Sequence, residues 1–151
     1  MPIRRTAILL LFVFLASLLL LAACSKVTEN VSPSPKPQPA KFAELYPGDM
    51  TRITKIHMMN GSNGERRAIE DPQLIREWTA RVRDLVLTPD PDQGGRTGYL
   101  YALKCWERDE ERLLFLPNEI NRVWYLPNDD MFDAAKWLYA KGRTLGEEVP
   151  F

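Results

Sequence analysis

One histidine and two cysteines are the residues of this 151-residue chain that most readily act as nucleophiles or metal ligands. His57 is the only histidine, so a Ser-His-Asp or Cys-His catalytic pair would have to use it. A zinc site needs several histidine or cysteine ligands, and one of the two cysteines is expected to be modified. We therefore predict no metal site, no cofactor and no enzymatic activity, with His57 as a surface or packing residue.

Carboxylates are numerous, but their spacing does not single out a catalytic pair. Asp90, Asp92 and Gly95 match the first, third and sixth positions of a calcium loop. Tyr101 then occupies the twelfth position, where that loop requires a bidentate glutamate. A solvated acidic loop is the simpler interpretation, and a hydrolase that uses two carboxylates stays open as an alternative.

Cys24 follows the basic pair Arg4-Arg5 and an apolar run that extends to Ala23. This order is typical of a secretory signal peptide, and Leu21-Ala22-Ala23-Cys24 resembles the lipobox of bacterial lipoproteins. The resemblance implies cleavage before Cys24 and a thioether between its sulfur and a diacylglycerol. An uncleaved transmembrane helix is the alternative. We expect a protein that is anchored by lipid on the extracytoplasmic face of the cell membrane.

Removal of residues 1–23 changes the charge balance of the chain. Arg4 and Arg5 are lost from the 20 basic side chains, which leaves 18 against 20 acidic ones, a formal charge of −2. Nucleic acids and anionic bilayers select basic surfaces, so neither is expected as the main partner. With Cys24 modified, Cys105 has no intramolecular disulfide partner and is expected to be a small buried hydrophobic residue, with an intermolecular disulfide as the alternative.

The expected domain organisation has three parts. Residues 1–23 form the cleaved signal peptide, and residues 24–41 form the lipidated cysteine and a disordered, proline-rich tether. Proline at every second position from Pro33 to Pro39 excludes a helix or a central strand. In an extended state, the tether would hold the domain up to about 45 Å from the lipid. Residues 42–151 are expected to form a single globular α+β domain.

Two helices are predicted within this domain. Asp71 is a strong N-cap and Pro72 suits the first helical position. The spacing of Ile75, Trp78, Val82 and Leu85 then gives one apolar stripe over about four turns. A second helix is expected over residues 130–141, capped by Asn128 or Asp129 and ended by Gly142 at the C′ position.

The remaining segments predict a mostly antiparallel sheet of about five strands. Residues 53–59 form an edge strand with a bulge, and the turn at residues 60–64 leads into a strand at residues 65–69. Residues 99–106, 112–116 and 120–126 form three further strands joined by short turns. Both helices would pack on one face of this sheet.

The most distinctive region combines residues 96–101 with residues 120–125. Together with the helix capped by Asp71, its Gly-Tyr-x-Tyr and Trp-Tyr strands resemble small extracytoplasmic lipoproteins of Gram-positive bacteria, Bacillus and Paenibacillus relatives especially, which mostly lack an assigned function. The resemblance covers about residues 51–141 and implies an envelope location and an α+β domain, but it brings no catalytic residues. Six residues of the region form the candidate binding surface: Arg96, Tyr99, Tyr101, Arg122, Trp124 and Tyr125. Because strands bury every second residue, alternate members are expected to belong to the core instead.

The leading hypothesis is a lipid-anchored extracytoplasmic binding or accessory module of the cell envelope. It rests on the anchor, the tether and the lack of a catalytic constellation. Its partners would be the membrane, through the N-terminal lipid, and an envelope protein. An envelope hydrolase that uses carboxylates and a structural subunit of a membrane complex are the alternatives.

Overall fold

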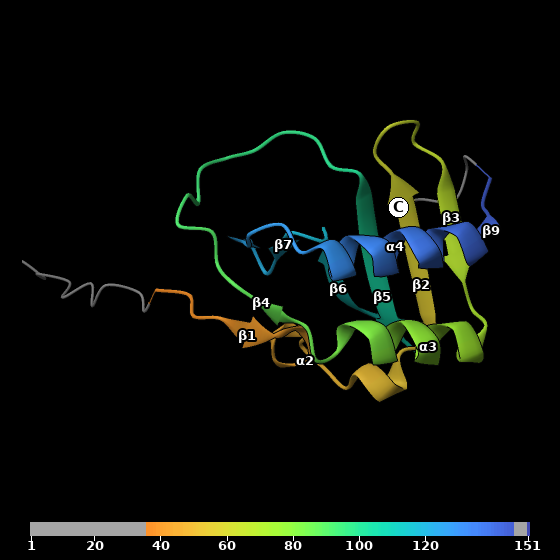
Figure 1. Ribbon diagram of the computed structural model, residues 1–151. Helices are drawn as coiled ribbons and strands as arrows, with labels where there is room; N and C mark the ends of the chain where they lie inside the picture. Colours follow the sequence, from red (N-terminus) through yellow and green to blue (C-terminus); the bar gives the residue numbers. More distant parts are fainter. Residues whose placement is uncertain (1–35, 147–150) are drawn as a thin grey trace, which may run out of the picture. The chain divides into compact units, whose positions relative to one another are not determined.

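The computed structural model describes residues 36–146 and residue 151 (Figure 1). The expected signal peptide, Cys24 and the tether up to residue 35 lie outside the described residues. Lys36–Phe151 forms one compact unit. Its elements are, in order, β1 (Ala40–Lys41), α2 (Phe42–Leu45), a 3-10 turn (Met50–Arg52), β2 (Lys55–Asn60), β3 (Arg66–Ile69), α3 (Pro72–Val82), β4 (Val86–Leu87), β5 (Tyr101–Glu107), β6 (Glu110–Phe115), β7 (Glu119–Ile120), β8 (Val123–Trp124), α4 (Asp129–Lys141) and β9 (Arg143–Thr144).

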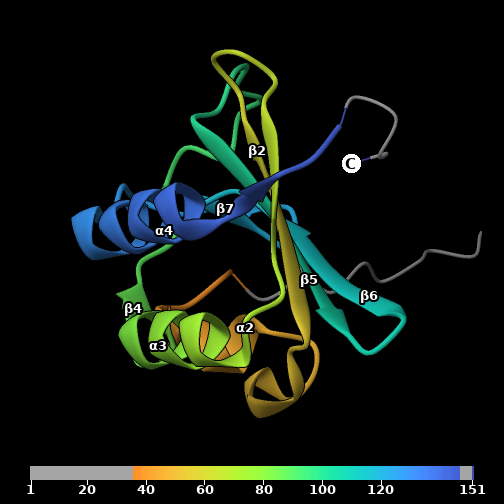
Figure 2. The same ribbon diagram turned by 90° about the vertical axis from the view of Figure 1, so that its right-hand side faces the viewer.

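The main sheet has five strands in the order β6-β5-β2-β3-β9, and every neighbouring pair is antiparallel. Figure 2 shows α3 and α4 on the same side of this sheet. The predicted α+β class, the antiparallel five-stranded sheet and the two helices on one face are therefore confirmed. None of the described helices is long and apolar enough to cross a bilayer.

Both long helices begin at the predicted caps. The Asp71 carboxylate accepts hydrogen bonds from the backbone amides of Gln73 and Leu74, and the Asn128 side chain accepts one from the Met131 amide. Helix α3 ends at Val82, one turn earlier than predicted, because the chain turns there into β4, which pairs with β1.

Gly142 ends α4, as predicted, but without the left-handed conformation common at helix ends. Its φ is −70°, so it is not an αL terminator. A Cβ atom at this position would lie 2.9 Å from Cβ of Arg67 on β3. The close approach of α4 and the sheet therefore requires the absence of a side chain.

The predicted hairpins of residues 53–59 with 65–69 and of residues 99–106 with 112–116 are confirmed, but the prediction of an edge strand at residues 53–59 is wrong. Strands β2 and β3 form the predicted hairpin, with Gly64 at φ 74° in its turn. However, β2 is a central strand and not an edge, since β5 pairs with its other side. The bulge lies in β5, between Cys105 and Trp106.

The predicted strand over residues 120–126 is also wrong. It is split into β7 and β8, which pair with each other across Asn121 and Arg122, both at positive φ (53° and 65°). The short strands β1, β4 and β9 were not predicted, and β1 begins at Ala40, two residues before the expected start of the domain.

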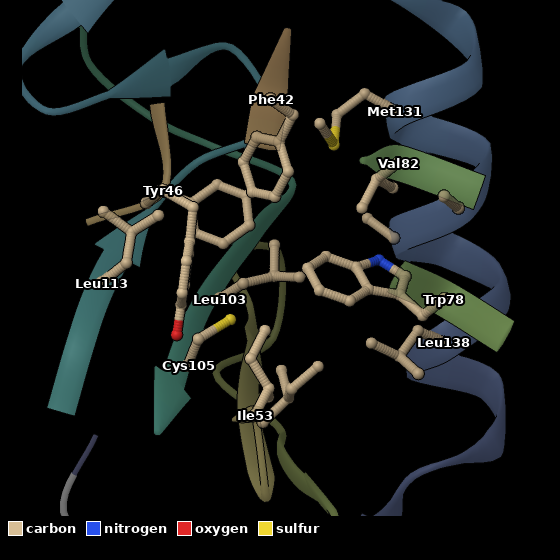
Figure 3. Close-up of a cluster of buried hydrophobic side chains, with 14 of the residues drawn as sticks. Phe42, Tyr46, Ile53, Trp78, Val82, Leu103, Cys105, Leu113, Met131 and Leu138 are labelled. Carbon is tan, nitrogen blue, oxygen red and sulfur yellow. The ribbon is translucent and has the colours of Figure 1, made fainter. Parts of the chain in front are cut away.

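The core lies between the sheet and the helices (Figure 3). Trp78 of α3 is fully buried at its centre and meets the Phe42 ring edge-on at 6.1 Å between centroids. Cys105 points into the same core, is fully buried and is a free thiol. The prediction of a small buried hydrophobic residue is confirmed, and complete burial keeps this thiol away from an intermolecular disulfide partner.

Candidate functional site

The sheet has a second face, opposite α3 and α4, that no described helix covers (Figure 2). Ile56, Met58, Leu103 and Cys105 point into the core, so the residues that alternate with them point the other way. We call this second face the outer face; it is defined by Lys55, His57, Met59, Ala102, Lys104, Trp106 and Leu114. Most of these side chains are partly exposed, whereas Ala102 is buried.

A mostly apolar cavity of about 490 Å³ opens at one end of the outer face. Strands β2, β5 and β6 supply its floor, and the turn between β7 and β8 supplies one wall. Asn121 anchors this turn, because its side-chain amide donates a hydrogen bond of 2.7 Å to the Leu45 carbonyl. The lining residues are Met59, Tyr99, Ala102, Leu114, Phe115, Leu116, Glu119, Asn121, Arg122 and Phe151.

Beyond the cavity, basic side chains lie across the outer face. Lys104 of β5 pairs with His57 of β2, His57 with Ala68 of β3, and Ala68 with Arg143 of β9, so these residues form one row across the sheet. Lys55 lies one row away, with its ammonium 4.4 Å from the centroid of the Trp106 ring.

His57 responds to these charges. Burial lowers the pKa of His57 most, and the nearby cations Lys55, Lys104 and Arg143 lower it further, against a smaller opposing effect of Glu70. The imidazole is therefore neutral at pH 7. A neutral, partly buried imidazole is consistent with the expected packing role of His57. The contribution of Lys55, Lys104 and Arg143 to the lowered pKa reflects the positive charge around it on the outer face.

The six residues of the predicted binding surface do not form one surface. Tyr99 and Arg122 line the cavity. Arg96 instead packs on Trp124, with its guanidinium carbon 5.2 Å from the ring centroid, and bonds to the Asp90 carboxylate at 2.5 Å. Gln93 bonds to both the backbone amide and the carbonyl of Trp124. These contacts fasten the loop before β5.

Tyr101 and Tyr125 were wrongly placed on the contact surface. Tyr101 lies on the helix face of β5, with its ring 5.2 Å from that of Tyr139 on α4. Tyr125 is 2% exposed and belongs to the core. The expectation that alternate members are core residues is confirmed for these two.

Sequence reasoning missed every lining residue of the cavity except Tyr99 and Arg122; on the strands, it missed Met59, Ala102 and Leu114, as well as Lys104 beside the Phe151 ring. All four alternate with core residues on their strands. The alternation was visible in the sequence, but the pairing of β2 with β5, which brings them together, was not.

The acidic residues are arranged as structural partners. Glu107 is almost fully buried, accepts a hydrogen bond from the Asp49 amide at 2.9 Å, and lies 3.6 Å from Nε of Arg112 and 3.8 Å from Nε of Arg52. Hydrogen bonds lower the pKa of four other carboxyls: Asp49, Glu65, Asp84 and Asp90. Within residues 36–146, and including residue 151, no group of three or more His, Cys, Asp or Glu residues could hold a metal ion.

Comparison with known proteins adds no relative: no family model, curated protein or solved structure matches this chain.

Proposed function

We propose that this protein is a lipid-anchored, extracytoplasmic binding module of the cell envelope, and that the outer face of its sheet is the binding surface. The observation that carries the proposal is the apolar cavity on a sheet face that no described helix covers. Binding sites for small molecules are typically mostly apolar concavities of about 300–1,000 Å³ with a few polar groups. The 490 Å³ cavity, with Glu119, Asn121 and Arg122 among its lining residues, fits this description.

The proposed anchor rests on the lipobox-like residues 21–24 and on the proline-rich segment after them. A tether of this composition would let the domain extend away from the membrane without fixing its orientation. Mass spectrometry of the membrane-extracted protein tests the anchor. We expect a chain that begins at Cys24 and carries a lipid, and Cys24→Ala should abolish both processing and lipid attachment.

The rival hydrolase would need a carboxyl whose pKa is raised, to act as a general acid. Each described carboxyl with a shifted pKa has it lowered, and the buried Glu107 lies between two arginines. These arrangements favour binding over acid–base chemistry.

In-cell photo-crosslinking tests the binding surface. A photoreactive benzoylphenylalanine replaces Leu114 on the outer face, or Val86 on β4 as the matched control; the two residues are 52% and 55% exposed. We expect light to produce a discrete adduct from position 114 and not from position 86. Adducts of equal yield from both positions, or from neither, would refute the proposed surface.

A further inference from the structure

The chemical character of the bound molecule can be derived from the surroundings of the cavity, on the basis of the proposed function above. Its floor is apolar: Met59, Ala102 and Leu114 contribute side chains of moderate size and leave the 490 Å³ unfilled. A hydrocarbon chain or ring would gain about 25 cal/mol for each Å² of apolar surface that it buries there.

The rim of the cavity is cationic on two sides. The Lys104 ammonium lies 5.3 Å from the centroid of the Phe151 ring, which lines the cavity. Lys104 is also the next residue but one after Ala102, so it lies about 7 Å along the same face of β5. Arg122 lines the cavity directly, from the turn between β7 and β8.

Partial burial and an ion pair hold the Lys104 side chain beside the cavity. Its side chain is only 13% exposed and its ammonium is 3.2 Å from the Glu111 carboxylate. Glu111 itself is more exposed, so an incoming anion can share or replace this partner. A partly buried ammonium favours a paired anion more strongly than one in open water does.

The sign of the outer face is opposite to that of the chain as a whole. Residues 24–151 carry a formal charge of −2. On and beside the outer face, however, four cations outnumber three carboxylates: Lys55, Lys104, Arg122 and Arg143 against Glu70, Glu111 and Glu119. Of these cations, Lys104 and Arg122 lie beside the cavity, together with Glu111 and Glu119.

We propose that the cavity binds an anionic amphiphile, with its hydrocarbon part against Met59, Ala102 and Leu114 and its carboxylate or phosphate group against Lys104 and Arg122. An uncharged hydrocarbon would use the floor and make no ion pair with either cation. A free inorganic anion would use the cations and leave the floor empty. Only a molecule with both parts uses both features.

Methyl NMR of methionine tests this directly, because Met59 lines the cavity while Met50, Met58 and Met131 are buried in the core. The full, lipidated chain is labelled at the methionine methyl groups and embedded in phosphatidylcholine nanodiscs. Hexanoate, hexyl phosphate, hexan-1-ol and inorganic phosphate are titrated in turn. The two organic anions separate a carboxylate ligand from a phosphate ligand.

We expect at least one of the two organic anions to shift the Met59 signal saturably, and the three core methionines to stay unchanged. Its Kd should be about tenfold or more below that of hexanol, as for one charge-assisted hydrogen bond. Inorganic phosphate alone should not move Met59. Lys104→Gln should raise the Kd of the anion several-fold toward that of hexanol, with Arg122 supplying the remaining preference, while Lys136→Gln, on α4, should not change it.

Arg122→Asn provides a second variant that keeps a residue tolerant of positive φ, and the core methionine signals report whether each variant is folded. Equal affinity for hexanol and both anions would overturn the anionic part of the proposal. A Met59 signal that no compound moves would overturn the amphiphile altogether. In either case, an adduct from position 114 would still support the proposed binding surface, so the two proposals fail separately.

Discussion

Glu107 provides the most quantitative test of how the acidic residues are used. Its side chain is 3% exposed, and it joins the Asp49 amide, Arg112 and Arg52 at the end of β5. The structure assigns it to holding the 3-10 turn against the sheet. Glu107→Ala removes the acceptor of the Asp49 amide and leaves a buried Nε of Arg112 without a carboxylate partner.

The expected cost follows from these contacts. Breaking a fully buried ion pair destabilises a protein by about 3–5 kcal/mol, but Arg52 and Arg112 are both partly exposed. We therefore expect a loss of about 2–3 kcal/mol, similar to the loss of hydrogen bonds to a charged group. Glu107→Gln retains an acceptor for the Asp49 amide and should lose about 1–2 kcal/mol.

The matched control is Glu110→Gln. Glu110 also bonds to Arg112, at 2.7 Å, but it is 63% exposed. Exposed pairs contribute about 0–1 kcal/mol, so its loss should be the smallest of the three. Urea unfolding followed by tryptophan fluorescence measures all three variants. A Glu107→Ala variant as stable as Glu110→Gln would refute the structural role assigned to Glu107.

Three further predictions concern the cap, the buried thiol and the histidine. Asp71→Ala should cost about 1 kcal/mol in the same urea experiment, because the amides of Gln73 and Leu74 lose their acceptor; exposed Asp133→Ala should stay within about 0.5 kcal/mol of wild type. Cys105 should not react with iodoacetamide at pH 8 until urea unfolds the chain, since burial raises the pKa of its thiol; rapid labelling of the native protein would show that the core is open. His57 should titrate below 6.5 by NMR, and Lys55→Gln should raise its pKa. Because unfolded His57 binds its proton more readily, the unfolding free energy should fall as the pH drops below about 6.5, and this part of the pH dependence should be absent in His57→Gln.

The parts of the fold that depend on local signals could be predicted from the sequence. Asp71 and Asn128 mark helix starts by accepting hydrogen bonds from amides within the next three residues, and Pro72 does so through its fixed φ. The β2–β3 hairpin likewise follows from its turn. By contrast, β2 becomes a central strand only because β5, more than forty residues later, pairs with it. No local pattern records such a pairing.

In the candidate site, too, residues with a local signal were predicted and residues brought together by strand pairing were not. Tyr99 and Arg122 were found because they are distinctive residues beside turns, and both line the cavity. Tyr101 was misplaced, although its spacing from Leu103 and Cys105 already put it on the core side of β5. Met59 and Lys104 are ordinary strand residues, and only the cross-strand register brings them to one face.

Crosslinking from Leu114 and Val86 tests the central claim most directly, because the two positions are equally exposed and differ in the face on which they lie. The account predicts a light-dependent adduct of discrete mass from position 114 alone, in cells where Cys24 is intact. Adducts from both positions in equal yield, or from neither, would contradict the assignment of the outer face as the binding surface.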